Sequence, residues 1–129
     1  MIRALLLPAV VALTACGTPD TPVTVVPPSA ADIASTAYAT CVDKAAAAVD
    51  LTADQPAALT NRVMKACRDA RAEVVAEVAA AQVATGKDAA TAAALAEKSV
   101  RVADSDLRDR ANPVIVRAKL KASGVARDH

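Results

Sequence analysis

Small and apolar residues recur at helical spacing through the middle of the chain. From about Ala30 they lie three or four positions apart, which places them on one face of a helix of roughly 20 residues. A second face of this kind follows Pro56 and continues for roughly 30 residues, to about Thr85. The first face comprises Ala34, Tyr38, Cys41, Ala45 and Val49, and the second comprises Leu59, Val63, Cys67, Ala70, Val74, Val78 and Ala81.

Turn-forming residues predict where these helices begin and end. The stretch before Pro56 interrupts the pattern. Because proline is tolerated in the first turn of a helix but not in its interior, Pro56 marks a new start, with Thr52 or Asp54 as the cap. Gly86 suits the end of the second helix, and Asp88 suits the cap of a third. The large apolar residues near one face of this third helix are Leu95, Val102 and Leu107.

The last part of the chain is ambiguous. Asn112-Pro113 is expected to close the third helix at about Ala111, and it can begin another helix with asparagine as the cap and proline in the first position. Residues 116–122 alternate in the manner of a strand. We favour a short helix here, because no partner strand is visible in the sequence.

The first residues carry the pattern of an export signal. A basic start at Arg3 precedes an apolar run over residues 4–15, which is shorter than the roughly 17 to 25 residues of a membrane-spanning helix. The run ends in Leu13-Thr14-Ala15-Cys16, which resembles the lipobox of bacterial lipoproteins. The resemblance implies that residues 1–15 are a cleaved signal peptide. It also implies that Cys16 is lipidated, becomes the first residue of the mature chain and anchors it to a membrane.

A proline-rich segment follows Cys16. Residues 17–29 hold four of the seven prolines and show no helical period, so residues 16–29 are expected to form an extended, lipidated tether. In many Gram-negative lipoproteins an aspartate after the cysteine signals inner-membrane retention, and Gly17 stands there in this chain. The resemblance therefore implies a cell-envelope location, at the outer membrane and facing the periplasm if the host is Gram-negative.

The cysteine count agrees with this interpretation. Three cysteines would leave one unpaired in a secreted protein. If Cys16 is acylated, Cys41 and Cys67 are free to form a disulfide in an oxidising compartment. Two buried free thiols, or a metal pair that lacks a third ligand, are the alternatives.

Residue numbers support an antiparallel pairing of the first two helices. Facing residues in such a hairpin have numbers with a constant sum, which for Cys41 and Cys67 is 108, centred on residue 54 in the predicted turn. The sequence therefore predicts an all-α fold, a small antiparallel bundle of three to four helices over residues 30–111 with one helix–helix disulfide, followed by a short basic helix or tail over residues 112–129. The same sum pairs Val49 with Leu59, Ala45 with Val63, Tyr38 with Ala70 and Ala34 with Val74.

Composition argues against several classes of function. The chain has 35 alanines and one aromatic residue, and the mature chain balances 14 basic against 14 acidic residues once Arg3 is removed. This composition offers neither the positive charge nor the stacking surfaces of a nucleic-acid-binding protein. The only histidine is His129, and no nucleophile-elbow or glycine-rich phosphate loop occurs. We therefore expect no enzymatic activity, no cofactor, no metal and no small-molecule substrate.

Clusters of charge are the remaining candidates for a site. The acidic cluster Asp104, Asp106 and Asp109 could suggest a cation site, but a salt-bridged, solvated face explains it better because basic residues lie nearby, Arg108 and Arg110 each four positions after an acid. Two basic stretches are either solvated faces or docking surfaces for an acidic envelope partner, and the second could also touch anionic lipid. They comprise Arg62, Lys65, Arg68 and Arg71 on the second helix, and Arg117, Lys119 and Lys121 in the tail.

One further motif bears on function. Residues 51–55, Leu-Thr-Ala-Asp-Gln, are similar to the Leu-Thr-x-x-Gln motif of the Spy/CpxP family of periplasmic helical chaperones and stress sensors, which typically carry it twice. A capping box at a helix start has the same pattern. We expect a non-enzymatic interaction or structural role in the cell envelope, with a membrane contact through Cys16 and a possible envelope protein partner. The alternatives are a holdase-like chaperone or stress sensor, and a phage-encoded lipoprotein acting in lysis or superinfection exclusion.

Overall fold

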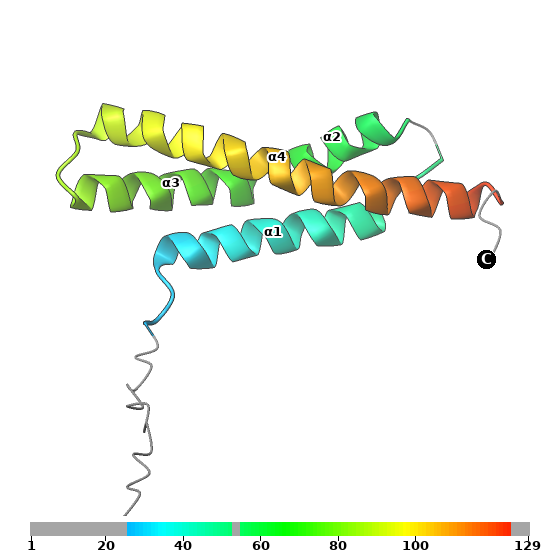
Figure 1. Cartoon of the computed structure of the whole chain (residues 1–129), viewed down its shortest axis with the longest axis horizontal. Coiled ribbons are helices and arrows are strands. Elements are labelled where there is room, and N and C mark those ends of the chain that lie inside the picture. The colour runs from blue at the N-terminus through cyan, green and yellow to red at the C-terminus, as the bar shows by residue number, and fades with distance from the viewer. Residues whose placement is uncertain (1–25, 53–54, 125–129) are drawn as a thin grey trace, which may run out of the picture.

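The chain folds into a bundle of helices. The computed structural model describes residues 26–52 and 55–124, and within these ranges it contains four helices and no strand. The helices are α1 (Ala30–Ala48), α2 (Pro56–Ala66), α3 (Arg68–Ala84) and α4 (Ala89–Ala122), in that order (Figure 1). The predicted all-α bundle is confirmed.

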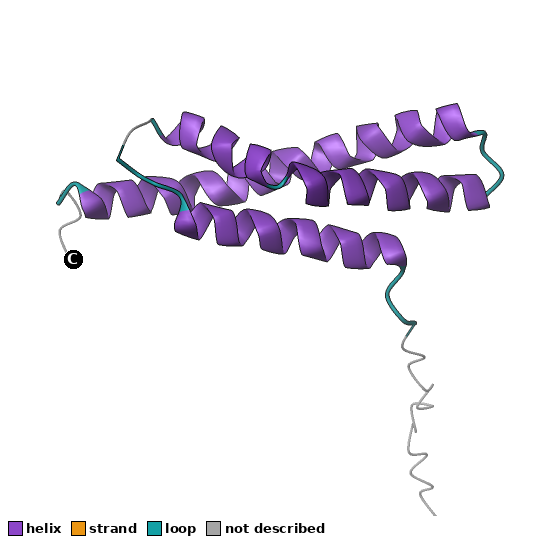
Figure 2. Ribbon diagram, turned by 180° about the vertical axis from the view of Figure 1, so that it is seen from behind, coloured by secondary structure: helices purple, strands orange, loops and turns teal. Residues whose placement is uncertain are grey.

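The longest helix, α4, runs along the whole bundle (Figure 1). α2 and α3 follow one another along α4 in the opposite direction, and α1 packs against all three other helices (Figures 1 and 2). Tyr38 and Asp104, which are 66 positions apart, are hydrogen-bonded, and so are Asp43 and Arg110, which are 67 apart. This nearly constant offset shows that α1 and α4 are parallel.

A disulfide joins α1 to the junction of α2 and α3. Cys41 and Cys67 are bonded, with their Cα atoms 5.9 Å apart, as predicted from the cysteine count. Cys67 is buried and Cys41 is half-buried. All the residues of the predicted apolar pairs are likewise buried or half-buried, which agrees with the antiparallel register.

The face that α1 buries is wider than predicted. Val42 and Ala46 are buried together with Tyr38, although neither belongs to the predicted face. The physical reason is that α1 contacts α4 as well as the α2–α3 layer, so side chains on two sides of α1 are buried. Burial of a large apolar side chain contributes about 1.5–3 kcal/mol, and Val42, Leu59 and Ile115 are fully buried.

The predicted turn between the second and third helices is confirmed. α3 ends at Ala84, and Gly86 has a φ of +93°, a conformation that costs glycine little because it has no Cβ. Asp88 caps α4, where its side chain accepts a hydrogen bond from the Thr91 backbone N–H at 3.0 Å. This turn lies at the same end of the bundle as the start of α1 (Figures 1 and 2).

The start of α1 carries a cap that the sequence analysis did not identify. The Ser29 hydroxyl accepts from the Asp32 backbone N–H at 3.2 Å, and the Asp32 carboxylate accepts from the Ser29 backbone N–H at 3.0 Å. The two residues therefore form a reciprocal capping box. The Asp32 carboxylate also accepts from the Ser29 hydroxyl at 2.7 Å, and this bond, together with the one from the Ser29 backbone N–H, lowers the pKa of Asp32.

The predicted second helix is divided in two. The helix breaks at Cys67, which has a φ of −100° and serves as the C-cap of α2 and the N-cap of α3. The prediction of one continuous helix is therefore wrong. Cys67, which leaves helical geometry, is also the residue that the disulfide fixes to α1. Its sequence neighbourhood contains neither proline nor glycine to signal a break.

The predicted cap of this helix is also wrong. The N-cap is Gln55, whose side chain makes no capping hydrogen bond, and Pro56 occupies the first helical turn as expected. Thr52 instead donates its hydroxyl to the Asp50 carboxylate at 2.7 Å. Asp54 lies outside the described residues.

The third predicted helix differs in its end and in its buried face. α4 continues through Pro113 to Ala122, so the predicted break at Asn112-Pro113 is wrong, whereas the preference for helix over strand in the tail is confirmed. Leu95 and Val102 are 37% and 63% exposed, because the packing face consists largely of alanine, which lets neighbouring helices approach closely. The buried residues of α4 are Ala92, Ala96, Val100, Leu107, Ala111 and Ile115. Ala81 on α3 is likewise exposed rather than buried.

Candidate functional site

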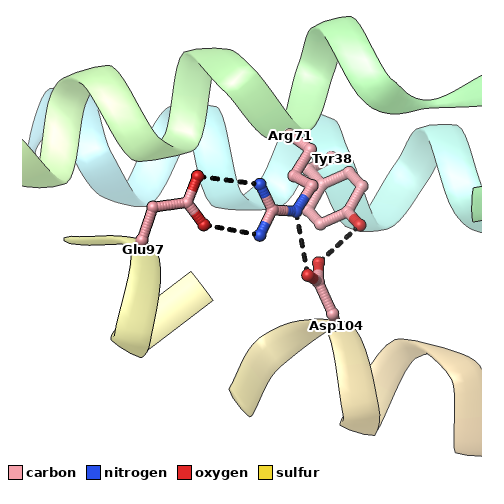
Figure 3. A network of polar contacts seen from close by, with 4 residues as sticks. All are labelled: Tyr38, Arg71, Glu97 and Asp104. Atoms are coloured by element: carbon pink, nitrogen blue, oxygen red, sulfur yellow. Dashed lines mark hydrogen bonds and ion pairs between the residues drawn. The ribbon is translucent and has the colours of Figure 1, made fainter. Parts of the chain in front are cut away.

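Four polar side chains meet where α1, α3 and α4 come together (Figure 3). The Arg71 guanidinium donates through Nε to Asp104 at 2.8 Å, and through Nη1 and Nη2 to the two oxygens of Glu97 at 3.3 and 2.9 Å. The Tyr38 hydroxyl donates to the other Asp104 oxygen at 2.7 Å. Both carboxylates are therefore held by one arginine, and Asp104 also ties α1 to α4.

The electrostatics of this network follow from burial and charge pairing. Burial, followed by the hydrogen bond to Asp104, raises the pKa of Tyr38 above its usual value. The hydrogen bonds to Glu97 and Asp104 raise the pKa of Arg71, and the bond from Arg71 lowers the pKa of Glu97. Tyr38 therefore stays a neutral hydrogen-bond donor, and the arginine stays charged.

The cations of α4 bond across helices rather than along their own helix. Arg108 donates to the Asn61 amide oxygen on α2, and Arg110 donates to Asp43 on α1 at 2.6 Å. The sequence spacing favoured pairs within the helix, from Asp104 to Arg108 and from the acid at position 106 to Arg110. Neighbouring helices provide the partners instead, since they bring oxygen atoms closer to these cations.

A cleft of about 260 Å³ opens beside the network, at the junction of all four helices. Tyr38, Arg71 and Asp104 of the network line it. Two further cations and two uncharged residues complete the lining, which are Lys65, Arg108, Asn61 and Met64. The basic stretch of the second helix predicted Lys65 and Arg71 as surface cations, but the position of Arg108 beside them depends on how α4 is rotated.

The first basic stretch does not remain one stripe on the surface. Arg71 turns inward to the network, where 27% of its side chain is exposed. Lys65 lines the cleft. Arg68 is exposed and lies 3.3 Å from Asp69, and Arg62 is exposed on α2. Only part of the predicted docking surface is therefore open to a partner.

The second basic stretch belongs to the last turns of α4 rather than to a separate tail. The Lys119 ammonium donates to the backbone carbonyl of Leu51 at 2.9 Å, which joins the end of α4 to the turn after α1. Arg117 and Lys121 are exposed. Two of the three predicted cations therefore remain on the surface.

The acidic cluster of α4 does not act as a unit. Asp104 points into the network, while Asp106 and Asp109 are exposed. Within the described ranges, no three histidine, cysteine or acidic side chains gather closely enough to hold a metal ion. Over the same part of the chain, none of the helices combines the length and the apolar character needed to cross a bilayer. Cys16 and His129 lie outside the described residues.

Comparison of the chain with protein-family models, with curated proteins and with solved structures gave no match.

Proposed function

We propose that this protein is a membrane-anchored bacterial lipoprotein with a non-enzymatic interaction or structural role in the cell envelope. The observation that carries the proposal is the sequence Leu13-Thr14-Ala15-Cys16 at the end of a short apolar run, in the arrangement of a lipobox. Lipid on Cys16 anchors the chain, and the bundle is the part that meets other envelope components.

The cysteine usage supports this location. Disulfides persist mainly in oxidising compartments such as the bacterial periplasm. Cys41 and Cys67 are bonded to one another, which leaves Cys16 as the one cysteine available for acylation in a chain of three.

The position of the tether supports an interaction role. Residues 17–29 connect Cys16 to the start of α1, and thirteen residues of proline-rich chain reach at most about 40 Å. This reach keeps the bundle close to the membrane surface while leaving its helix faces accessible to other proteins of the envelope.

The chemistry of the helix junction favours docking over catalysis. The groups that gather there are cations and their partners, and the Tyr38 hydroxyl is held neutral by burial and by Asp104. Covalent catalysis would require a nucleophile activated by an adjacent base. The cleft offers charged donors for recognition instead.

The anchor is tested with the Cys16→Ser variant of the full chain. We expect the native protein to incorporate labelled palmitate and to sediment with membranes, and the variant to lose both properties. Lys121→Ser serves as the matched control and should behave as native. Membrane association of Cys16→Ser without lipid label would contradict the lipid anchor and point to the basic end of α4.

The interaction role is tested by crosslinking the native lipoprotein in intact cells and identifying the attached proteins by mass spectrometry. One or two recurrent envelope proteins would support a dedicated interaction module. A broad set of unrelated secreted proteins would replace it with the holdase-like alternative that the motif at residues 51–55 suggests. Genes for lysis or exclusion beside this one would favour the phage-encoded alternative.

A further inference from the structure

The cleft at the helix junction carries positive charge that the protein does not neutralise. Arg71 is balanced by Asp104 and by Glu97. By contrast, Lys65 has no ion-pair partner among residues 26–52 and 55–124, and Arg108 bonds to the uncharged Asn61 amide. Three cations therefore accompany two carboxylates around the cleft, and the excess charge lies on the part of its wall that carries Lys65 of α2 and Arg108 of α4.

The hydrogen-bonding groups on this wall are donors. Because the Asn61 amide oxygen accepts from Arg108, its NH₂ group remains to donate to a ligand. The Lys65 ammonium adds three N–H donors. The Asp104 oxygens, which also line the cleft, accept from Arg71 and from Tyr38, so they compete little for these donors.

We infer that this cleft is a binding site for a carboxylate group presented by an envelope partner, held by Lys65, Arg108 and the Asn61 amide. This inference rests on the interaction role proposed above. It adds the chemistry of the group that docks. Charge-assisted hydrogen bonds of a carboxylate to ammonium and guanidinium groups are among the stronger polar contacts in proteins. An acidic side chain and a free peptide C-terminus present the same group, and the test distinguishes them.

The charge of the cleft selects a carboxylate over a phosphate. The cations around the cleft exceed the protein's own carboxylates by one positive charge. One carboxylate of a ligand neutralises this charge. A phosphate group that carries nearly two negative charges at neutral pH would place additional negative charge beside Asp104, which lines the same cleft. Met64, which is 7% exposed, contributes apolar surface to the cleft and reduces the competition from water.

The experiment is a titration of the ¹⁵N-labelled full chain carrying Cys16→Ser, with its disulfide intact, followed by NMR. The acidic-side-chain probe is acetyl-Ala-Glu-Glu-Ala-amide, and the C-terminal probe is acetyl-Ala-Ala-Ala with a free carboxyl group. The uncharged peptide acetyl-Ala-Gln-Gln-Ala-amide and inorganic phosphate serve as comparisons. We expect saturable shifts of the Asn61 side-chain NH₂ and of the Lys65 and Arg108 amides with a carboxylate peptide, and weaker binding as salt is added.

Four variants localise the binding. Lys65→Met and Arg108→Leu should each raise the Kd about tenfold, since each removes a charged donor. Arg117→Leu, on an exposed position of the same helix as Arg108, should leave the Kd unchanged. Asn61→Asp places a carboxylate within the cleft itself, so it should abolish peptide binding while the melting temperature stays equal or rises, a result that misfolding would not give.

The outcomes separate this site from the broader proposal. Equal shifts with the glutamine peptide, tighter binding of phosphate than of either carboxylate peptide, or an unchanged Kd in Lys65→Met would overturn the carboxylate site, even if crosslinking in cells found a partner. Saturable carboxylate binding without any crosslinked partner would establish the site and remove the interaction role. A lower Kd for one of the two carboxylate peptides identifies the source of the group.

Discussion

Replacing Arg71 with methionine tests whether the polar network holds the helices together. The substitution keeps an apolar stem of similar length and removes the three hydrogen bonds that the guanidinium makes to Glu97 and Asp104. It leaves Asp104, whose side chain is 17% exposed, with the Tyr38 hydroxyl and without its cation. We therefore expect the bundle to lose stability.

The magnitude follows from the exposure of the two carboxylates. Glu97 is 45% exposed, so its pairing with Arg71 is screened by water and adds little to the loss. The bond to the more buried Asp104 is worth about 1.5–3 kcal/mol. The expected loss is therefore about 1.5–3 kcal/mol, which corresponds to a fall in Tm of roughly 6–24 °C for a domain of this size.

The assay is urea unfolding of the full chain carrying Cys16→Ser, followed by circular dichroism, with and without Arg71→Met. Arg117→Met is the matched control, because Arg117 is exposed on α4 and its loss should change stability by no more than about 0.5 kcal/mol. If Arg71→Met destabilises the chain no more than Arg117→Met does, the network does not support the bundle and this reasoning is wrong. A double variant with Glu97→Gln should lose less than the sum of the two single losses.

Three further predictions concern pH, the disulfide and the interior proline. The folded pKa of Glu97 is lowered, so its contribution to stability is present above the pKa of the unfolded chain and is lost as the pH falls through the folded pKa. The urea midpoint of Glu97→Gln should therefore change less on acidification than the midpoint of the native protein. Replacing both Cys41 and Cys67 with alanine should cost about 3.5 kcal/mol on the chain-entropy estimate for a separation of 26 residues, and an unchanged urea midpoint would contradict it. Pro113→Ala restores an N–H within α4 and should raise stability, by up to about 3 kcal/mol, whereas a lower Tm would show that the ring makes favourable contacts.

The sequence was informative where local signals determine structure. The spacing of small and apolar residues, Pro56 and the pairing of Cys41 with Cys67 predicted the α1-to-α2–α3 register, which the disulfide confirms. Gly86 and Asp88 marked the turn before α4, where both act as expected. The helix starts and the turn depend on chain stereochemistry and on hydrogen-bond partners within a few residues. The register depends on the bond between Cys41 and Cys67.

The sequence failed where the rotation and contacts of whole helices decide the outcome. Large side chains suggested that Leu95 and Val102 face the core, but an alanine surface packs there instead, with Ala92 and Ala96 fully buried. The helix α4 also continues through Pro113, although proline normally ends a helix. A contact from another helix lies at this point: Thr60 of α2 donates a 3.3 Å hydrogen bond to the side chain of Asn112, the residue before the proline.

The polar network was missed for the same reason. Arg71, Glu97 and Asp104 come together only when α3 and α4 adopt one particular rotation, and no spacing along the chain encodes it. The cleft depends on helix rotation as well, because its cations Lys65 and Arg108 come from α2 and α4. The single tyrosine on the buried face of α1 was the one sequence signal of this network, because a buried hydroxyl needs a partner and Asp104 provides it.

Tyr38 also gives this protein a built-in optical reporter. It is the only aromatic residue in the chain, so its fluorescence is not masked by energy transfer to tryptophan. In the folded state its hydroxyl is bonded to a carboxylate and its ring is 2% exposed, and hydrogen bonding to a carboxylate quenches tyrosine emission. The opening of the helix junction should therefore brighten the protein without any attached dye, and the same signal would follow occupancy of the adjoining cleft in real time.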